Sequence, residues 1–467
     1  MTILSTLRVY FHIDEPGRDA ITAVALKKHL IKKNIKLVYG NRKLTSALFK
    51  CSLTSAFDII ILPRPMFIPK SINKRAIKAK IMILPTESIG RVASRKNDRF
   101  VAFSILDQEY MEGDTLQVDQ VDRFFLWSES VKSSIVSLFP SLSQKLSVVG
   151  HPRFDALIVR PLVQRRSTSK QKVRRVGLIT RFPLLNDFDN RSVIESIIKS
   201  AIKNNPSDNF EYQNSQTQDS LSKQDPNIVD ELYKQASDIF VMMTMVSRLV
   251  EEGSLVEIKV HPRESYGAWE KILDQLGLGN SVRLVDRNTP FPIWVRHLDY
   301  VIGPASTSFY ECINLNVTPI CTKNIDKKRA AHLGPNDEED IDLIKYIYCP
   351  SNIEDLLDYL DRGTKLDVNA SLLDILSKET MYPKAKSSLS IVAEECSDEV
   401  QERCRYRTLL QGSVFLLFLL ANLLYNLAVK LRKRRFNLVL ESSSFILDRR
   451  ARAFIDSLLD IPNRAEQ

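Results

Sequence analysis

The feature that most restricts the fold of this chain is a repeated order of short apolar runs and longer amphipathic segments. Runs rich in β-branched and aromatic residues are typical of strands that helices cover on both faces. Strands that alternate with helices predict open, doubly wound parallel α/β sheets. The predicted strands are 7–13, 36–39, 57–62, 80–84, 123–127 and 146–149, and after a basic stretch 175–179, 256–260, 282–285, 299–302 and 318–321.

Two successive sheets predict two domains. The chain has 467 residues, which is enough for two domains of about 150–200 residues each. We expect an N-terminal Rossmann-like domain over 1–160, a basic linker over 161–175 and a second Rossmann-like domain over 176–400. Inside the second domain, the polar stretch 204–225 has the composition of a solvated loop or insertion.

An uncharged apolar stretch occupies residues 408–429. As a helix it would be about 33 Å long, which is enough to cross a hydrocarbon core of about 30 Å. Arginines and lysines flank it on both sides, and dense positive charge beside an apolar helix suits anionic headgroups. We therefore expect a membrane-associated helix at 408–429, which either spans or lies in the interface, and a basic tail at 430–467. The alternative is a buried helix that closes the second domain.

Charge and cysteine usage narrow the possible partners and compartments. Much of the net charge of +10 lies in 160–175 and 430–435, whereas a nucleic-acid-binding domain would spread its basic residues widely. We therefore expect no nucleic-acid partner.

The six cysteines are scattered without the spacing of a zinc site or a disulfide framework, so no metal and no cofactor are expected. The N-terminal residues suit a first strand better than a signal peptide, which predicts a cytoplasmic protein at the inner face of the cell membrane.

A histidine directly follows the predicted strand 256–260. Ligands of open α/β sheets bind beyond the carboxyl ends of the strands, and His261, Pro262 and Arg263 lie at that point. Imidazole and guanidinium groups both suit a phosphate oxygen. The segment therefore predicts a phosphate site, with a histidine that only caps the strand end as the alternative.

A hydroxyl-rich turn follows the predicted strand 299–302. Free backbone N–H groups at the start of a helix attract anions, so we expect Ser306 and Thr307 to face a phosphate. Ser308 and Glu311 have the spacing of a capping box, which needs no ligand. Glu311 is alternatively expected to accept hydrogen bonds from ribose hydroxyls.

Carboxylates follow two predicted strands of the first domain. Glu15 and Asp19 come after strand 7–13, and Glu87 comes after strand 80–84. A carboxylate at a strand end can act as the general base that takes a proton from an acceptor hydroxyl. Glu87 is the favoured base, and helix capping is the alternative for Asp14 and Asp19. The chain has neither a Walker A sequence nor a G-x-S-x-G sequence, which argues against an NTPase and a serine hydrolase.

Several short motifs occur in an order that resembles the bacterial surface carbohydrate biosynthesis proteins, a family similar to GT-B glycosyltransferases. Segment 149–155 is also similar to polyol-phosphate polymerising transferases and sugar-nucleotide 2-epimerases, and the His261–Pro262 pair with the later hydroxyl turn resembles the CMP site of bacterial sialyl- and Kdo-transferases. The matching segments are 15–20, 85–87, 125–127, 149–155, 261–264 with Trp269, and 306–308 with Glu311 and Pro319.

The resemblance implies a metal-independent GT-B-like glycosyltransferase that helps to build a cell-surface polysaccharide. Its donor would be a nucleotide-linked sugar, CMP- or UDP-linked for preference, and its acceptor a glycan or a lipid-linked sugar. The alternatives are a CDP-polyol phosphate transferase, a sugar-nucleotide epimerase and a non-catalytic GT-B-shaped assembly protein. Arg181 stands where the family is expected to have an asparagine. The residues expected to hold the nucleotide are His261, Arg263, Ser306, Thr307 and Glu311.

Overall fold

The computed structural model divides the chain into two compact units. Unit 1 comprises Met1–Leu162, Asp340–Leu343 and Val368–Gln467, and unit 2 comprises Val163–Glu339 and Ile344–Asp367. The structure describes residues 7–14, 16–72, 74–86, 105–106, 116–155, 173–182, 185–186, 228–261, 264–286, 289–325, 342–381, 387–403, 414–417 and 420.

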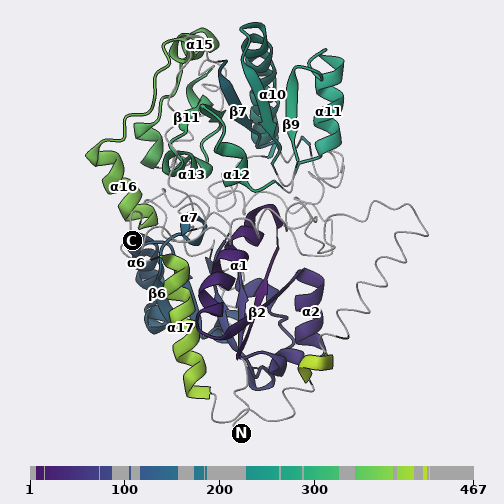
Figure 1. Cartoon of the computed structure of the whole chain (residues 1–467), viewed down its shortest axis with the longest axis vertical. Coiled ribbons are helices and arrows are strands. Elements are labelled where there is room, and N and C mark those ends of the chain that lie inside the picture. Colours follow the sequence, from purple (N-terminus) through teal and green to yellow (C-terminus); the bar gives the residue numbers. More distant parts are fainter. Residues whose placement is uncertain are drawn as a thin grey trace, which may run out of the picture. The chain divides into compact units, whose positions relative to one another are not determined.

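Unit 1 is built on a six-stranded parallel sheet with the order β2-β1-β3-β4-β5-β6 (Figure 1). All of its strands lie where the apolar runs predict them. Because every strand is parallel to its neighbours, all the carboxyl ends lie at one edge of the sheet. The strands are β1 (Leu7–His12), β2 (Ile35–Gly40), β3 (Ile59–Leu62), β4 (Lys80–Ile83), β5 (Arg123–Leu126) and β6 (Leu146–Val148).

Alternate residues of the unit 1 strands enter two hydrophobic cores, one on each face of the sheet. In β1, Val9 and Phe11 belong to one core, whereas Tyr10 belongs to the other. This is the period of two that a strand covered on both faces requires. The core around Val9 includes residues of α1 (Pro16–Ile31) and α17 (Ser388–Arg403), and the core around Tyr10 includes residues of α2 (Arg42–Lys50) and α6 (Glu129–Leu138).

The last described long helix belongs to unit 1, although the sequence places residues up to 400 in the second domain. Leu389, Val392 and Cys396 of α17 are buried in the same core as Val9. Glu395 of α17 forms an ion pair with Arg123 of β5 at 3.2 Å and accepts a hydrogen bond from the Ser147 hydroxyl of β6. The described part of unit 2 therefore ends at Asp367, before α16 (Ala370–Thr380). The apolar period of α17 indicates a buried face but not which sheet it covers.

Unit 2 is built on a five-stranded parallel sheet with the order β11-β10-β7-β8-β9 (Figure 1). Again all five strands lie where the sequence predicts them, and a long helix, α10 (Ile228–Glu251), precedes β8. The strands are β7 (Arg175–Ile179), β8 (Leu255–Lys259), β9 (Val282–Val285), β10 (Tyr300–Gly303) and β11 (Thr318–Cys321), and the other α-helices are α11 (Tyr266–Gln275), α12 (Phe291–Val295), α13 (Ser308–Asn314) and α15 (Ile353–Asp361).

The two faces of the unit 2 sheet are covered differently. Val176, Leu178 and Ile258 share a core with residues of α10, α11 and α15. On the other face, a Cβ atom at Gly177 would lie 2.6 Å from the Trp294 ring of α12. The glycine therefore lets α12 pack directly on β7.

Two further short helices are α5 (Leu116–Asp119) and α7 (Pro152–Asp155), and the 3-10 helices are Leu53–Ala56, Pro65–Phe67, Lys74–Ala76, Pro140–Lys145, Thr322–Asn324 and Asp342–Tyr346.

Most of the predicted apolar helix 408–429 lies outside the described residues. Residues 414–417 and 420 are described, and they are helical. Within the part of the chain that is described, no helix is both long enough and apolar enough to span a bilayer. The linker 161–175 is described only from residue 173, and the tail 430–467 and the polar stretch 204–225 lie outside the description.

Candidate functional site

The turns that follow three neighbouring strands of unit 2 meet at the carboxyl edge of the sheet. Strand β7 lies between β10 and β8. The turn after β7 is 180–182, the turn after β8 begins at His261, and the turn after β10 is 304–307. The edge where His261 and Ser306 are predicted to converge therefore also carries the segment that departs from the family pattern, at Arg181.

A buried carboxylate joins the turns that follow β7 and β8. The two oxygens of Glu264 accept hydrogen bonds from the Phe182 backbone N–H at 2.7 Å and from the Trp269 indole N–H at 2.9 Å. Burial raises the pKa of Glu264, and hydrogen bonds from Phe182, Trp269 and Thr180 act in the opposite direction. The carboxylate thus holds the turn of Phe182 against the turn that follows β8.

Thr180 makes a second connection between the same turns. Its hydroxyl accepts a hydrogen bond from the backbone N–H of His261 at 2.8 Å, and its own N–H donates to the carbonyl of Lys259 at 3.3 Å. The backbone of His261 is therefore fixed at the sheet edge, and its side chain is half-buried. This bond does not use the imidazole, so it would persist when the side chain is changed.

Arg181 reaches from the end of β7 to the turn after β10. Its side chain is exposed, and its Nη1 donates to the Ala305 carbonyl at 3.4 Å. Strands β7 and β10 also approach closely here, because a Cβ atom at Gly303 would lie only 3.0 Å from the Ile179 carbonyl oxygen. A guanidinium group therefore lies next to the hydroxyl-rich turn, where the family pattern predicts a neutral amide.

The start of α13 is capped differently from the predicted capping box. Ser308 is the first helical residue, and its N–H donates to the Ser306 hydroxyl at 3.1 Å. The prediction that Ser308 caps the helix is therefore wrong, because the helix begins one residue earlier than a Ser308 cap would require. Within the described chain, no hydrogen bond uses the N–H groups of Ala305, Ser306 or Thr307 as donors. Three consecutive donors are thus available beside Arg181.

The remaining predicted nucleotide residues are Glu311 and Arg263. Glu311 lies in the first turn of α13 and is buried. Arg263 and its neighbour Pro262 lie outside the described residues.

Of the three predicted catalytic carboxylates in unit 1, the structure describes only Asp19. Its side chain is fully buried in α1 and accepts a hydrogen bond from the Asp14 N–H at 2.9 Å. This bond connects Asp19, which lies inside α1, to the turn between β1 and α1. Glu15 and Glu87 lie outside the described residues, although the preceding Thr86 is buried at the end of β4.

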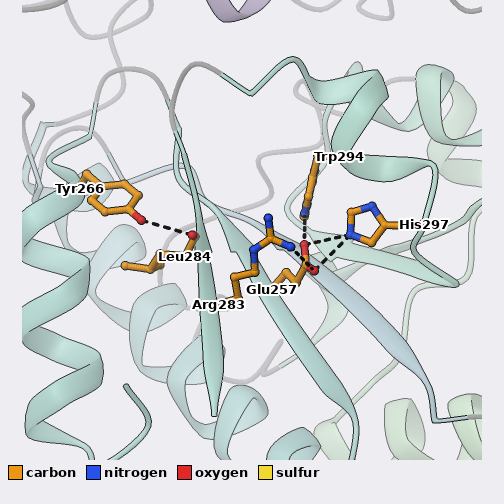
Figure 2. Close-up of polar contacts among 6 residues, drawn as sticks. All are labelled: Glu257, Tyr266, Arg283, Leu284, Trp294 and His297. Carbon is orange, nitrogen blue, oxygen red and sulfur yellow. Dashed lines mark hydrogen bonds and ion pairs between the residues drawn. The ribbon is translucent and has the colours of Figure 1, made fainter. Parts of the chain in front are cut away.

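A second polar cluster lies on the sheet face that α12 covers, and sequence reasoning missed it. Figure 2 shows Glu257 of β8 accepting hydrogen bonds from the indole N–H of Trp294 at 2.8 Å and from Nε2 of His297 at 3.1 Å, while Arg283 of β9 lies 3.3 Å away. A glutamate in the middle of an apolar strand is the signal that could have found it. Burial opposes the ionisation of Glu257, but these partners together lower its pKa.

The Glu257 cluster supports the fold of unit 2 and lies away from the site at the carboxyl edge. Glu257 is in the middle of its strand, and its partners belong to α12, to the loop after α12 and to the edge strand β9 (Figure 2). Among the described residues, no group of three or more histidine, cysteine or acidic side chains is arranged to hold a metal ion.

Comparisons with known proteins identify no family for the chain. No family model matches it, and no curated protein matches it. Its resemblance to the surface carbohydrate biosynthesis proteins therefore rests on the short motifs alone.

Several solved structures are similar to the chain at TM-scores below 0.5. A complex of S. aureus MnaA with UDP is 11% identical over 85% of this chain and 97% of that chain, with a TM-score of 0.43. Methanocaldococcus jannaschii UDP-GlcNAc 2-epimerase with UDP-GlcNAc and UDP is 12% identical over 84% of this chain and 99% of that chain, with a TM-score of 0.42. Anabaena HepE with UDP and glucose is 9% identical over 85% of this chain and 100% of that chain, with a TM-score of 0.39.

Proposed function

We propose that the carboxyl edge of the unit 2 sheet binds the phosphates of a nucleotide-linked sugar, and that the protein acts on this sugar nucleotide. The observation that carries the proposal is the pairing of three available N–H donors, at Ala305, Ser306 and Thr307, with the exposed guanidinium of Arg181. The two groups come from neighbouring strands of one sheet. A phosphate bound at this edge would accept hydrogen bonds from both.

Phosphate suits this arrangement better than other ligand groups. Consecutive backbone N–H groups at the start of a helix form an anion-binding concavity, and a guanidinium can bind two phosphate oxygens at once. In this proposal His261, whose turn lies on the other side of the Arg181 turn, is a third group that binds a second phosphate or a sugar hydroxyl. A diphosphate that links a nucleoside to a sugar matches such an extended set of donors.

Two reactions on this ligand follow from the sequence resemblance. Glycosyl transfer moves the sugar to a glycan or a lipid-linked acceptor, whereas epimerisation inverts one carbon of the sugar and needs no acceptor. Both begin with the same bound sugar nucleotide. A protein that binds the ligand without turnover would be the assembly protein named as the third alternative.

The test of binding is a thermal-shift panel of CMP, CDP, UDP, GDP and ADP on the full chain. A ligand that binds only the folded state stabilises it by about 2.7 kcal/mol at a hundred times its dissociation constant, which is a measurable shift. We expect a pyrimidine nucleotide to shift the wild type, and we expect Arg181→Ala and His261→Ala to lose that shift. Arg181→Ala should melt normally without ligand because Arg181 is exposed, and His261→Ala keeps the backbone hydrogen bond to Thr180.

The matched control is Lys271→Ala, which removes an exposed positive charge from α11. It should keep the full shift. A shift that survives in both site variants would place the nucleotide elsewhere, and a panel without any shift would contradict the proposal.

The reaction is tested with a UDP- or CMP-linked sugar in deuterated water, followed by NMR spectroscopy. Epimerisation by proton removal and return incorporates deuterium into the sugar in the absence of acceptor. Glycosyl transfer releases the free nucleotide only when an acceptor extract is added, and leaves the carbon-bound protons in place. Binding without either change would favour the assembly protein.

A further inference from the structure

The described residues near the C-terminus combine an anchored side chain with an exposed apolar surface. Phe415 is buried against unit 1, with its ring centroid 5.9 Å from that of Phe57 and 3.9 Å from the guanidinium carbon of Arg8. On the same short helix, yellow-green in Figure 1, Leu416, Leu417 and Leu420 are 68%, 57% and 51% exposed. One side of the helix is thus fixed to the protein while three leucines face solvent.

This helix lies at the edge where the strands of the unit 1 sheet begin. Arg8 and Lys36 are register partners near the starts of β1 and β2, and Phe57 directly precedes β3. The Lys36 ammonium lies 5.4 Å from the Phe415 ring centroid. The exposed leucines therefore sit at the amino edge of the sheet, opposite the carboxyl edge that Asp19 and Thr86 follow.

Exposed lysines lie along the same edge of the sheet. They belong to the segments that lead into β2, β3 and β4, and parallel strands all begin on one side of the sheet. The carboxylates beside these segments are Asp58, Asp119 and Asp122, and of these three only Asp119 is exposed, so the exposed lysines outnumber them. The exposed lysines are Lys32, Lys33, Lys36, Lys50, Lys74 and Lys78.

We propose that this amino edge of unit 1, made of the three leucines and the lysines around them, docks on an anionic lipid bilayer. Leucines that enter the interface bury apolar surface, and lysines beside them attract anionic headgroups. The surface charge selects this occupant over a second copy of the chain, because a symmetric dimer at this edge would place the lysines of both copies together. The inference is independent of the nucleotide site, which belongs to unit 2.

Co-sedimentation of the full chain with lipid vesicles tests the proposal. Vesicles of phosphatidylcholine alone are compared with vesicles that also contain phosphatidylglycerol, at low and at high salt. We expect binding to the anionic vesicles that weakens as salt screens the charges. The two test variants are Lys32→Gln/Lys33→Gln/Lys36→Gln and Leu416→Ser/Leu417→Ser/Leu420→Ser.

Both variants should weaken binding without unfolding the protein, because every substituted side chain is exposed. The affinity of the lysine variant for anionic vesicles should fall about fivefold for each charge removed, and thus about 10²-fold in total. The affinity of the leucine variant for the same vesicles should fall about tenfold or more. The matched controls replace exposed residues elsewhere and should bind as the wild type does: Lys271→Gln/Lys345→Gln/Lys378→Gln and Leu255→Ser/Leu276→Ser/Leu373→Ser.

Three outcomes would overturn the proposal. The first is a wild type that does not bind, or that binds neutral vesicles equally well. The second is a leucine variant that binds as tightly as its control, which would place the lipid contact elsewhere. The third is a wild type that is dimeric in solution and becomes monomeric in the leucine variant, because a second copy would then occupy the surface.

Discussion

The Glu264 carboxylate accepts a hydrogen bond from the Trp269 indole at 2.9 Å, and both side chains are buried. Its other oxygen accepts the Phe182 N–H at the end of β7. One side chain therefore connects the turn after β7, the turn after β8 and the first turns of α11. This explains why a glutamate and a tryptophan, five residues apart, accompany the His261 motif: they hold the turns that present Arg181 and His261.

Removing that carboxylate should destabilise unit 2 and loosen the site. Glu264→Ala leaves the Phe182 N–H and the Trp269 indole N–H without an acceptor in a buried place, so we expect a loss of about 3 kcal/mol in the free energy of unfolding. Trp269→Phe removes only the indole donor and should cost less, about 1–2 kcal/mol. Urea unfolding followed by circular dichroism measures both. Equal losses in the two variants would contradict the joining role of Glu264.

The Glu257 cluster predicts a stability that depends on pH in the acid range. The partners of Glu257 lower its pKa below the ordinary 4.5 in spite of burial. A carboxylate with a lowered folded pKa contributes stability above its unfolded pKa and loses it as pH falls through the folded value. Glu257→Gln should cost about 2 kcal/mol at pH 7, and the difference from wild type should shrink as pH drops below 4.5.

Urea unfolding of both proteins across that range measures the effect. Glu270→Gln, on the exposed side of α11, is the control and should follow the wild type. A difference that stays constant down to acid pH would mean that Glu257 contributes through packing and not through charge.

The close packing of α12 on β7 predicts opposite effects for two glycine substitutions. A Cβ atom at Gly177 would overlap Leu298 and lie 2.6 Å from the Trp294 ring, whereas a Cβ atom at Gly267 in α11 has no neighbour within 4 Å. Gly177→Ala should lower the free energy of unfolding by about 1–3 kcal/mol through overpacking. Gly267→Ala should raise it by about 0.5–1 kcal/mol, because alanine favours the helix. Thermal melting measures both. If Gly177→Ala leaves the stability unchanged, α12 can move to accommodate the added methyl group.

Glu87 stays the proposed general base for the reaction. It lies outside the described residues, and the residue before it, Thr86, is buried beyond the carboxyl end of β4. Glu87→Gln should keep the thermal shift with nucleotide and lower turnover by about 10²-fold or more. Steady-state rates with the sugar nucleotide measure this, and an unchanged rate would move the role to another group.

The sequence by itself determined the two parallel sheets. Each apolar run, from LRVYFH at Leu7–His12 to TPIC at Thr318–Cys321, is a strand of a parallel sheet, because such apolar composition suits strands that are covered on both faces. The same pattern predicts the phosphate site at the carboxyl edge of the unit 2 sheet. All parallel strands end at that edge, and His261 and Ser306 each follow one of them. Those features are local, and a local pattern is enough to read them.

Only the tertiary structure decided how residues far apart in the chain combine. Arg181 meets Ala305 because β7 lies beside β10 in the sheet, although 124 residues separate them. Glu257 binds His297 because α12 and the loop after it pack on the sheet face of Glu257, and α17 returns to the first sheet because its apolar face fits the core around Val9. Strand order and helix docking depend on the total surface that each arrangement buries, and no single segment of sequence carries that sum.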